Sequence, residues 1–286
     1  MTAQDAINQL LQEQKLSFSA LNAFATSPRA LLQYKMAAFE PSESMVVGQM
    51  VHTYTLEPNE ANSRYLVLPD ANGATKEGKQ AWYNLYCQYV EQVPEDGFKM
   101  KIDDIKASIL SSTGLQPVSA KMVEAAKYMS DALKTNSQSS IFLKDGVPEL
   151  AFATFIEGVQ FSGRVDLLNK PGNYIADIKT MADASRNAAA RDIIKKRYHW
   201  QAAIYMQAFD VEDFYFLCVD SKGEVSVHSI SEALRQQAMS EIKSYVQRFK
   251  ECLQEPELFT QSQEFYCGIN VLDVYVKWWP LPGKRW

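Results

Sequence analysis

The segment 148–180, PELAFATFIEGVQFSGRVDLLNKPGNYIADIKT, constrains the fold of this 286-residue chain more than any other. It contains three short runs of aromatic and β-branched residues, separated by Glu157-Gly158 and by the turn sequence Lys170-Pro171-Gly172-Asn173. Runs of this length between turn residues are typical of strands, and tight turns join antiparallel neighbours. The segment therefore predicts three consecutive antiparallel strands in a meander.

Helical patterns flank the meander on both sides. Residues 17–39 predict short helices, with Ser19 as the N-cap of the first and Ser27-Pro28 opening the second. A strand pair is predicted around Ser221-Lys222-Gly223. The remaining predictions are a helix ending at Pro58, helices and loops over 59–118, a helix opened by Ser119 over 119–143, and helices over about 183–208 and 231–253. Helices around a mixed sheet indicate an α/β or α+β domain.

Composition limits the class of protein. The net charge is −5, and the apolar and charged fractions are ordinary, as in globular proteins. No apolar run approaches the roughly 20 residues of a membrane span. The opening MTAQDAINQLLQEQKLSF lacks the pattern of a secretory signal, so we expect a cytoplasmic location. The four cysteines are scattered, and we expect reduced, partly buried thiols.

Three polar side chains interrupt the apolar runs of the meander. Asp177 and Lys179 lie two residues apart and should share one face of the third strand, while Ile178 points into the core. A hairpin turning at 170–173 can place Asp166 beside Asp177. Alone, an Asp-x-Lys pair is more often a surface pair at a sheet edge, but Asp166 across the hairpin favours a functional site.

Two carboxylates and an ammonium on one sheet face cost desolvation unless something compensates. A hard divalent cation compensates, and carboxylate oxygens suit Mg²⁺ or Mn²⁺. Such an ion would polarise a phosphate and activate a water, while Lys179 would orient that water, help deprotonate it or offset developing charge. Glu149 begins the first strand near the same sheet edge, and Glu157 lies close by, so either residue is a candidate further acid.

Two helical pairs accompany this set. Gly48 and His52 lie four apart on an upstream helix, and Gln201 and Tyr205 lie four apart on the helix after the meander. Together with Glu149, Asp166 and Asp177-Ile178-Lys179, they resemble the RecB-like branch of the PD-(D/E)xK nucleases, with the RecE-type exodeoxyribonuclease domain as the closest likeness. The stretches Ser17 to Pro28 and GQMVHTYTLEP also look like that family, and the likeness runs to about Leu253.

The resemblance implies roles for these residues. The metal would be held by His52, Asp166, Asp177 and the carbonyl of Ile178, with Lys179 as the catalytic lysine and Glu149 as the loosest assignment. Gln201 and Tyr205 would position the DNA backbone or the lysine. Relatives with an iron–sulfur cluster use one early cysteine and a tight late trio, which this chain lacks, so no cluster is expected.

The resemblance also implies a fold and an activity. The fold would be a restriction-endonuclease-like core within a single nuclease domain over 1–286: a mainly helical N-terminal segment over 1–147, a catalytic segment over 148–253 and a tail over 254–286. The activity would be Mg²⁺-dependent 5′→3′ exonuclease digestion of double-stranded DNA with a free end, leaving 3′ single strands for recombination. A ring-like homo-oligomer and cooperation with a single-strand annealing protein are implied as well.

Alternatives remain at this level. The chain could instead be a structure-specific endonuclease or repair nuclease of the same fold, or an inactive module that binds DNA or a partner. The basic run 186–197 is either a solvated helix face or a contact to DNA phosphates through Arg191, Lys195, Lys196 and Arg197. The tail with Trp278, Trp279 and Trp286 either stacks on bases or docks on protein, and His199 and His228 are interpreted as structural.

Overall fold

The structure is a computed structural model that describes residues 1–38, 40–72, 74–91 and 99–261, and the backbone of 276–278. It separates into two compact units. Unit 1 comprises Met1–Glu40 with Ala132–Trp286, and unit 2 comprises Pro41–Asp131. The predicted meander falls in unit 1, and each unit is described by itself.

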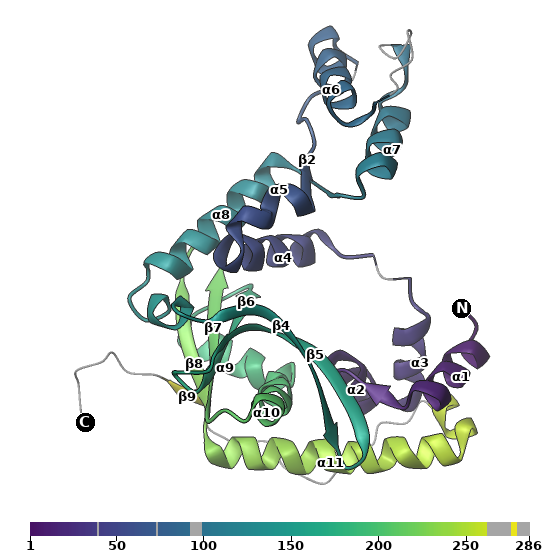
Figure 1. Cartoon of the computed structure of the whole chain (residues 1–286), viewed down its shortest axis with the longest axis vertical. Coiled ribbons are helices and arrows are strands. Elements are labelled where there is room, and N and C mark those ends of the chain that lie inside the picture. Colours follow the sequence, from purple (N-terminus) through teal and green to yellow (C-terminus); the bar gives the residue numbers. More distant parts are fainter. Residues whose placement is uncertain (39, 73, 92–98, 262–275, 279–286) are drawn as a thin grey trace. The chain divides into compact units, whose positions relative to one another are not determined.

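Unit 1 is built on a mixed sheet with the order β1-β5-β6-β7-β8-β9, in which β4 also pairs with β5 (Figure 1). The pairs β4–β5 and β5–β6 are antiparallel, as predicted, whereas β6–β7 is parallel. The strands are β1 (Lys15–Leu16), β4 (Val147–Ile156), β5 (Val159–Asn169), β6 (Tyr174–Met181), β7 (Asp213–Asp220), β8 (Val225–Ile230) and β9 (Val276–Trp278). The mixed α/β fold and its central sheet agree with the predicted fold class.

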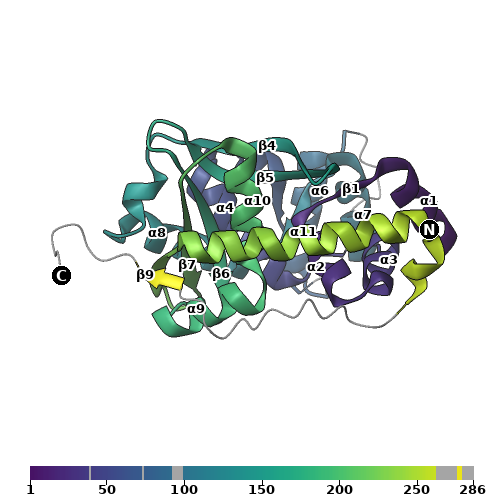
Figure 2. The same cartoon turned by 90° about the horizontal axis from the view of Figure 1, so that it is seen from below.

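Helices cover this sheet. Helix α10 lies inside the curve of β4, β5 and β6 (Figure 1). Helix α11 packs on α10 and runs along unit 1 to α2 (Figure 2). The helices are α1 (Ala3–Glu13), α2 (Phe18–Thr26), α3 (Pro28–Met36), α9 (Arg186–Lys195), α10 (Tyr198–Phe209) and α11 (Glu232–Gln254), with 3₁₀ turns η3 (Ser140–Leu143) and η4 (Pro256–Thr260).

The side chains of β5 that pack in the core next to α10 show where the alternation of side chains along this strand is interrupted. Phe161 and Val165 pack in this core, in step with the two-residue period of a strand. Leu168 belongs to the same core although it lies three residues after Val165. The strand therefore switches face between these two residues, and Asp166 lies at the switch.

Unit 2 holds mainly helices, with one short parallel strand pair. Helix α4 ends before Pro58, as predicted, and Trp82, Tyr86 and Ile109 are central to a separate apolar core. The elements are α4 (Glu43–Leu56), η1 (Pro58–Glu60), α5 (Ala61–Arg64), β2 (Tyr65–Val67), α6 (Lys76–Tyr89), α7 (Ile102–Thr113), β3 (Gln116–Val118) and α8 (Ala120–Thr135), the last of which continues into unit 1. No described helix in either unit is both long and apolar enough to span a bilayer.

Three sequence predictions are corrected. The N-cap of α2 is Ser17 rather than Ser19, because the Ser17 side chain accepts the N–H of Ala20 at 3.2 Å. The helix predicted over 183–208 is two helices, because Arg197 adopts a left-handed φ of 56° between α9 and α10. Cys87 is exposed rather than partly buried. Cys218 and Cys252 are buried free thiols, and Cys267 lies outside the described residues.

Candidate active site

Three acids occupy one row across β4, β5 and β6. Leu150 pairs with Val165 and Pro148 with Leu167, so Glu149 stands opposite Asp166. Leu167 pairs with Ala176, so the next position brings Asp166 opposite Asp177. Neighbouring strands lie about 4.8 Å apart, so these three positions are adjacent across the sheet. We call Glu149, Asp166 and Asp177 the row acids.

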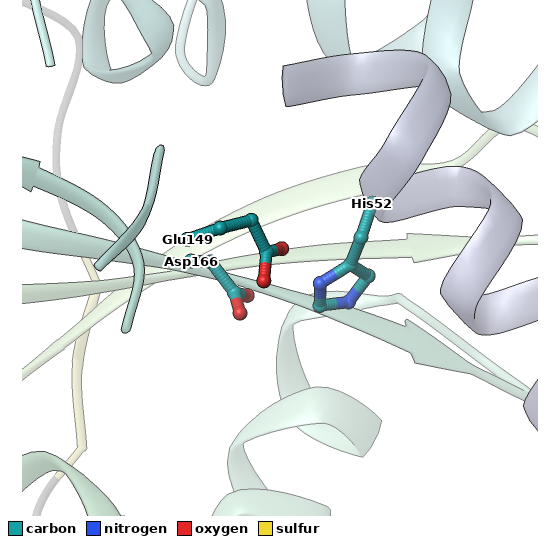
Figure 3. Close-up of side chains that lie close together, drawn as sticks. All are labelled: His52, Glu149 and Asp166. Atoms are coloured by element: carbon teal, nitrogen blue, oxygen red, sulfur yellow. The ribbon is translucent and has the colours of Figure 1, made fainter. Parts of the chain in front are cut away.

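The Glu149 and Asp166 carboxylates point into the same space (Figure 3). Their ligand oxygens lie within 4.8 Å of each other. The backbone of Glu149 has a left-handed φ of 52°, an unfavourable conformation for a residue with a Cβ atom in the middle of a strand. Glu157 lies in the β4–β5 turn and pairs with Lys243 at 3.2 Å, so the geometry favours Glu149 as the third acid.

Asp166 is held by the backbone of β6. Its Oδ2 accepts the N–H of Ile178 at 2.7 Å, in place of a regular ladder bond between the strands. The Ile178 side chain is buried, as predicted. In an extended strand the N–H and C=O of one residue point toward the same neighbouring strand, so the Ile178 carbonyl is directed to the Asp166 side.

Asp177 is nearly inaccessible, with 1 % of its surface exposed, and its partners come from two elements. Lys179 Nζ lies 2.7 Å from Oδ2 on the same strand face, as the spacing predicts. The amide Nε2 of Gln201, on α10, donates to Oδ1 at 3.1 Å. The structure thus brings Asp177, Lys179 and Gln201 together.

The environment keeps Lys179 cationic. Burial alone would lower its pKa, but the carboxylates of Asp177 and Asp166 outweigh burial and raise the pKa well above its usual range. The ammonium also lies 4.6 Å from the ring centroid of Tyr198, a cation–π contact. In this arrangement Lys179 donates hydrogen bonds and offsets negative charge.

Helix α10 presents Tyr198, Gln201 and Tyr205 on one face, because their spacings of three and four match the helical repeat. Burial, with the nearby Asp177 carboxylate, raises the pKa of Tyr205 to about 12, so its hydroxyl stays protonated at neutral pH. A Cβ at Gly163 would come within 3.3 Å of the Tyr205 ring, so glycine permits this close approach. Tyr198 is not among the residues predicted from the sequence, although it lies three residues before Gln201 and so shares the helical face of Gln201 and Tyr205.

The basic residues proposed to contact DNA have different surroundings. Lys196 Nζ lies 5.9 Å from the centroid of the Tyr198 ring, which Lys179 also contacts, and it pairs with Asp192. Arg197 donates to Asn22 Oδ1 at 2.9 Å and lies over the Trp200 ring, so its described contacts are internal. Arg191 and Lys195 are exposed on α9.

The three histidines have separate surroundings. His52 is partly buried on α4 of unit 2 and is described as a residue of that unit, although Figure 3 also labels it. His199 is buried with Nε2 3.6 Å from Glu241, and His228 is buried beside Ser226, as expected for structural residues. Of the tail, Trp279 and Trp286 lie outside the described residues, and Trp278 is described only as backbone of β9.

A second group of acids gathers in unit 1: Asp183, Asp220 and Glu224, which we call the turn acids. Their ligand oxygens also lie within 4.8 Å of one another. Asp220 accepts the backbone N–H groups of Lys222, Glu224 and Ala184 at 2.9, 3.1 and 3.2 Å. Asp183 accepts the N–H of Ser185 at 2.8 Å. The Asp183 and Asp220 carboxylates thus close turns, which accounts for their positions.

The chain is similar to one family of known domains and to solved structures. A family model described as a PDDEXK-like domain of unknown function (DUF3799) matches residues 17–268. The solved structure of a putative exonuclease from Eubacterium rectale is 13 % identical, covers 90 % of this chain and 87 % of its own, and superposes with a TM-score of 0.55.

A second solved structure, SSO0001, is 12 % identical over 76 % of this chain and 87 % of its own, with a TM-score of 0.29. No curated protein matches the chain. The exonuclease structure thus supports the same fold, while the family model covers both units.

Proposed function

Because the chain belongs to the PDDEXK-like family DUF3799, we propose that it is a metal-dependent deoxyribonuclease whose active site is the row acids together with Lys179. The observation that carries the proposal is the row itself. Glu149 and Asp166 bring their carboxylate oxygens within 4.8 Å of each other, and on the adjacent strand Asp177 pairs with the buried Lys179.

The donor set fits a hard divalent cation. Glu149 and Asp166 offer carboxylate oxygens within 4.8 Å of each other, and the Ile178 carbonyl is directed to the same side. Oxygen ligands of this kind suit Mg²⁺, with Mn²⁺ as a substitute. We propose Asp166, Asp177, Ile178 and Glu149 as the protein ligands, with His52 of unit 2 as a further ligand on the strength of the sequence resemblance.

When bound, the ion supplies Lewis-acid polarisation of the phosphate and a more acidic water. The chain's own residues do the rest. Gln201 fixes the Asp177 carboxylate through its amide, and Asp177 in turn holds the Lys179 ammonium. The ammonium offsets the charge that develops on the phosphate oxygens as water attacks. Tyr205 keeps its proton and serves as a hydrogen-bond donor to the DNA backbone.

The finer proposal is a 5′→3′ exonuclease acting on double-stranded DNA with a free end and leaving 3′ single strands for recombination. It rests on the likeness of the motif set to RecE-type nucleases, as do the proposed homo-oligomer and annealing partner. Lys196 is well placed to contact a phosphate because it shares the Tyr198 ring with Lys179. Arg191, Lys195 and Arg197 remain proposed contacts to DNA.

The test is digestion of a linear duplex by the full chain with Mg²⁺, with Mn²⁺ or with EDTA. We expect metal-dependent release of nucleotides, lost in Asp177→Asn and kept in Asp183→Asn, a matched change among the turn acids. A 5′ label should leave as mononucleotide early, while a 3′ label stays in long strands.

Covalently closed circular DNA should survive this digestion. Nicking of the circle would identify an endonuclease of the same fold. A chain that cuts equally well in EDTA, or an Asp177→Asn variant as active as the parent, would overturn the proposed site.

A further inference from the structure

Arg164 lies next to the row acids without being one of them. It precedes Asp166 by two residues on β5, and its Nη1 lies 3.5 Å from Oε2 of Glu149. The Arg164 side chain is 64 % exposed, and an ion pair of this length in water contributes little to stability. The stability of the fold therefore does not explain an arginine at this position.

The surface around Arg164 is made of small side chains. Its cross-strand partner is Ala151, and the next pair along the hairpin is Ala153 with Ser162. Ala151 and Ala153 are both exposed. The guanidinium therefore rises from a low surface in unit 1 that a bulky phosphodiester backbone can approach.

The chemistry of the Arg164–Glu149 pair suggests an exchange of partners. A planar guanidinium binds phosphate through two parallel hydrogen bonds. The ion pair between Glu149 and Arg164 weakens when Glu149 also ligates a metal ion, because the ion attracts the carboxylate and repels the guanidinium. Arg164 then has both the freedom and the position to bind a phosphate beside the metal.

We propose that Arg164 is a phosphate-binding residue that pairs with Glu149 in the metal-free protein and with a DNA backbone phosphate when metal is held at the row acids. The inference rests on the proposed nuclease function. It predicts effects of opposite sign on two ligands. Replacing Arg164 with a neutral residue removes the repulsion between its guanidinium and the metal ion, so metal binding becomes tighter. The same replacement removes one contact to a DNA phosphate, so DNA binding becomes weaker.

The experiment compares the full chain with Arg164→Gln. Calorimetric titration with Mn²⁺ alone, in the absence of DNA, should show binding about 3-fold tighter in the variant. Steady-state digestion of a linear duplex should show a KM about 10-fold higher with kcat nearly unchanged. The slope of log KM against log salt should become shallower by about one counterion.

Two further variants isolate the cause. Arg164→Lys keeps the positive charge but loses the two parallel hydrogen-bond donors of the guanidinium. Its Mn²⁺ affinity should therefore match the parent, while its KM for DNA should rise by less than in Arg164→Gln. Arg235→Gln is the matched control, because Arg235 on α11 also pairs with a glutamate, Glu232, at 3.6 Å. It should change neither measurement.

The outcomes are distinct. If Arg164→Gln binds Mn²⁺ and DNA as the parent does, or weakens both together, the exchange is wrong while the nuclease proposal stands. If the parent neither binds Mn²⁺ nor degrades DNA, the proposed function and the exchange both fail.

Discussion

Unit 1 contains two groups of acids that look alike by proximity and differ in their partners. Two of the turn acids give their oxygens to backbone N–H groups: Asp220 accepts from Lys222, Glu224 and Ala184, and Asp183 accepts from Ser185. The row acids lie within strands, and Asp177 meets the side chains of Lys179 and Gln201 instead. Closeness of carboxylates therefore does not identify a reactive site, whereas the buried lysine and glutamine beside Asp177 distinguish the row acids from the turn acids.

The sharpest way to break this comparison is to neutralise one acid in each group. Asp177→Asn should lower the rate of DNA cleavage by about 10³-fold, because the metal loses a charged ligand and Lys179 loses its counter-charge. Asp183→Asn should leave the rate per folded molecule unchanged. The measurement is kcat on linear duplex, with circular dichroism to verify folding. Equal losses in both variants would contradict the distinction.

Acid pH should act on the side of unit 1 that holds the turn acids. Burial lowers the pKa of His228 to about 4, below its usual value of 6.5. The folded state favours the neutral ring, so this contribution is fully present above pH 6.5 and is lost as pH falls from 6.5 to 4. About 3 kcal/mol of unfolding free energy should be lost over that window.

The control for this prediction is His228→Gln, which does not titrate. Ser226 donates to the carbonyl of Ala184, so Ser226 Oγ accepts from His228 Nε2, and a glutamine amide can donate in its place. Urea unfolding at several pH values should show a smaller acid loss in the variant. An identical pH dependence in parent and variant would refute the assignment to His228.

The turn acids should matter for stability. Asp220→Ala leaves three backbone N–H groups near β7 without their acceptor, which should cost about 2 kcal/mol of unfolding free energy. The Mn²⁺ affinity of the row acids should not change. Chemical denaturation and Mn²⁺ titration of the same preparation test both statements. Weaker Mn²⁺ binding in Asp220→Ala would contradict the distinction between the turn acids and the row acids.

The smallest expected effect concerns the ring beside Lys179. Tyr198→Leu should lower kcat by about 10-fold through loss of the cation–π contact, with KM for DNA nearly unchanged. Tyr198→Phe keeps the ring and should restore kcat. If Phe and Leu are equally impaired, the hydroxyl rather than the ring face is the important group.

The sequence was sufficient where the determining interactions are local. The turn at 170–173 sets the hairpin, and simple counting from it gives the observed pairing of Leu167 with Ala176, which are the neighbours of Asp166 and Asp177. Ser27-Pro28 opens α3 as predicted, because N-cap and proline preferences act within one helical turn.

The sequence predictions fail where contacts between distant segments determine the local structure. Ser17 rather than Ser19 caps α2, since β1 pairs with β5 until Leu16 and the helix begins directly after. Nothing local marks the break at Arg197, because the residues on both sides suit a helix. Helical spacing indicates that Tyr198 shares a face with Gln201 and Tyr205, but its contact with Lys179 depends on how α10 packs against β6.

The left-handed backbone at Glu149 carries a conformational cost in the folded chain. Any L side chain there costs about 1 kcal/mol that glycine would recover, and asparagine would recover part of it. Under the proposed nuclease function, a related chain that no longer cuts DNA would gain stability by replacing this glutamate with glycine, and an active relative would keep an acid here.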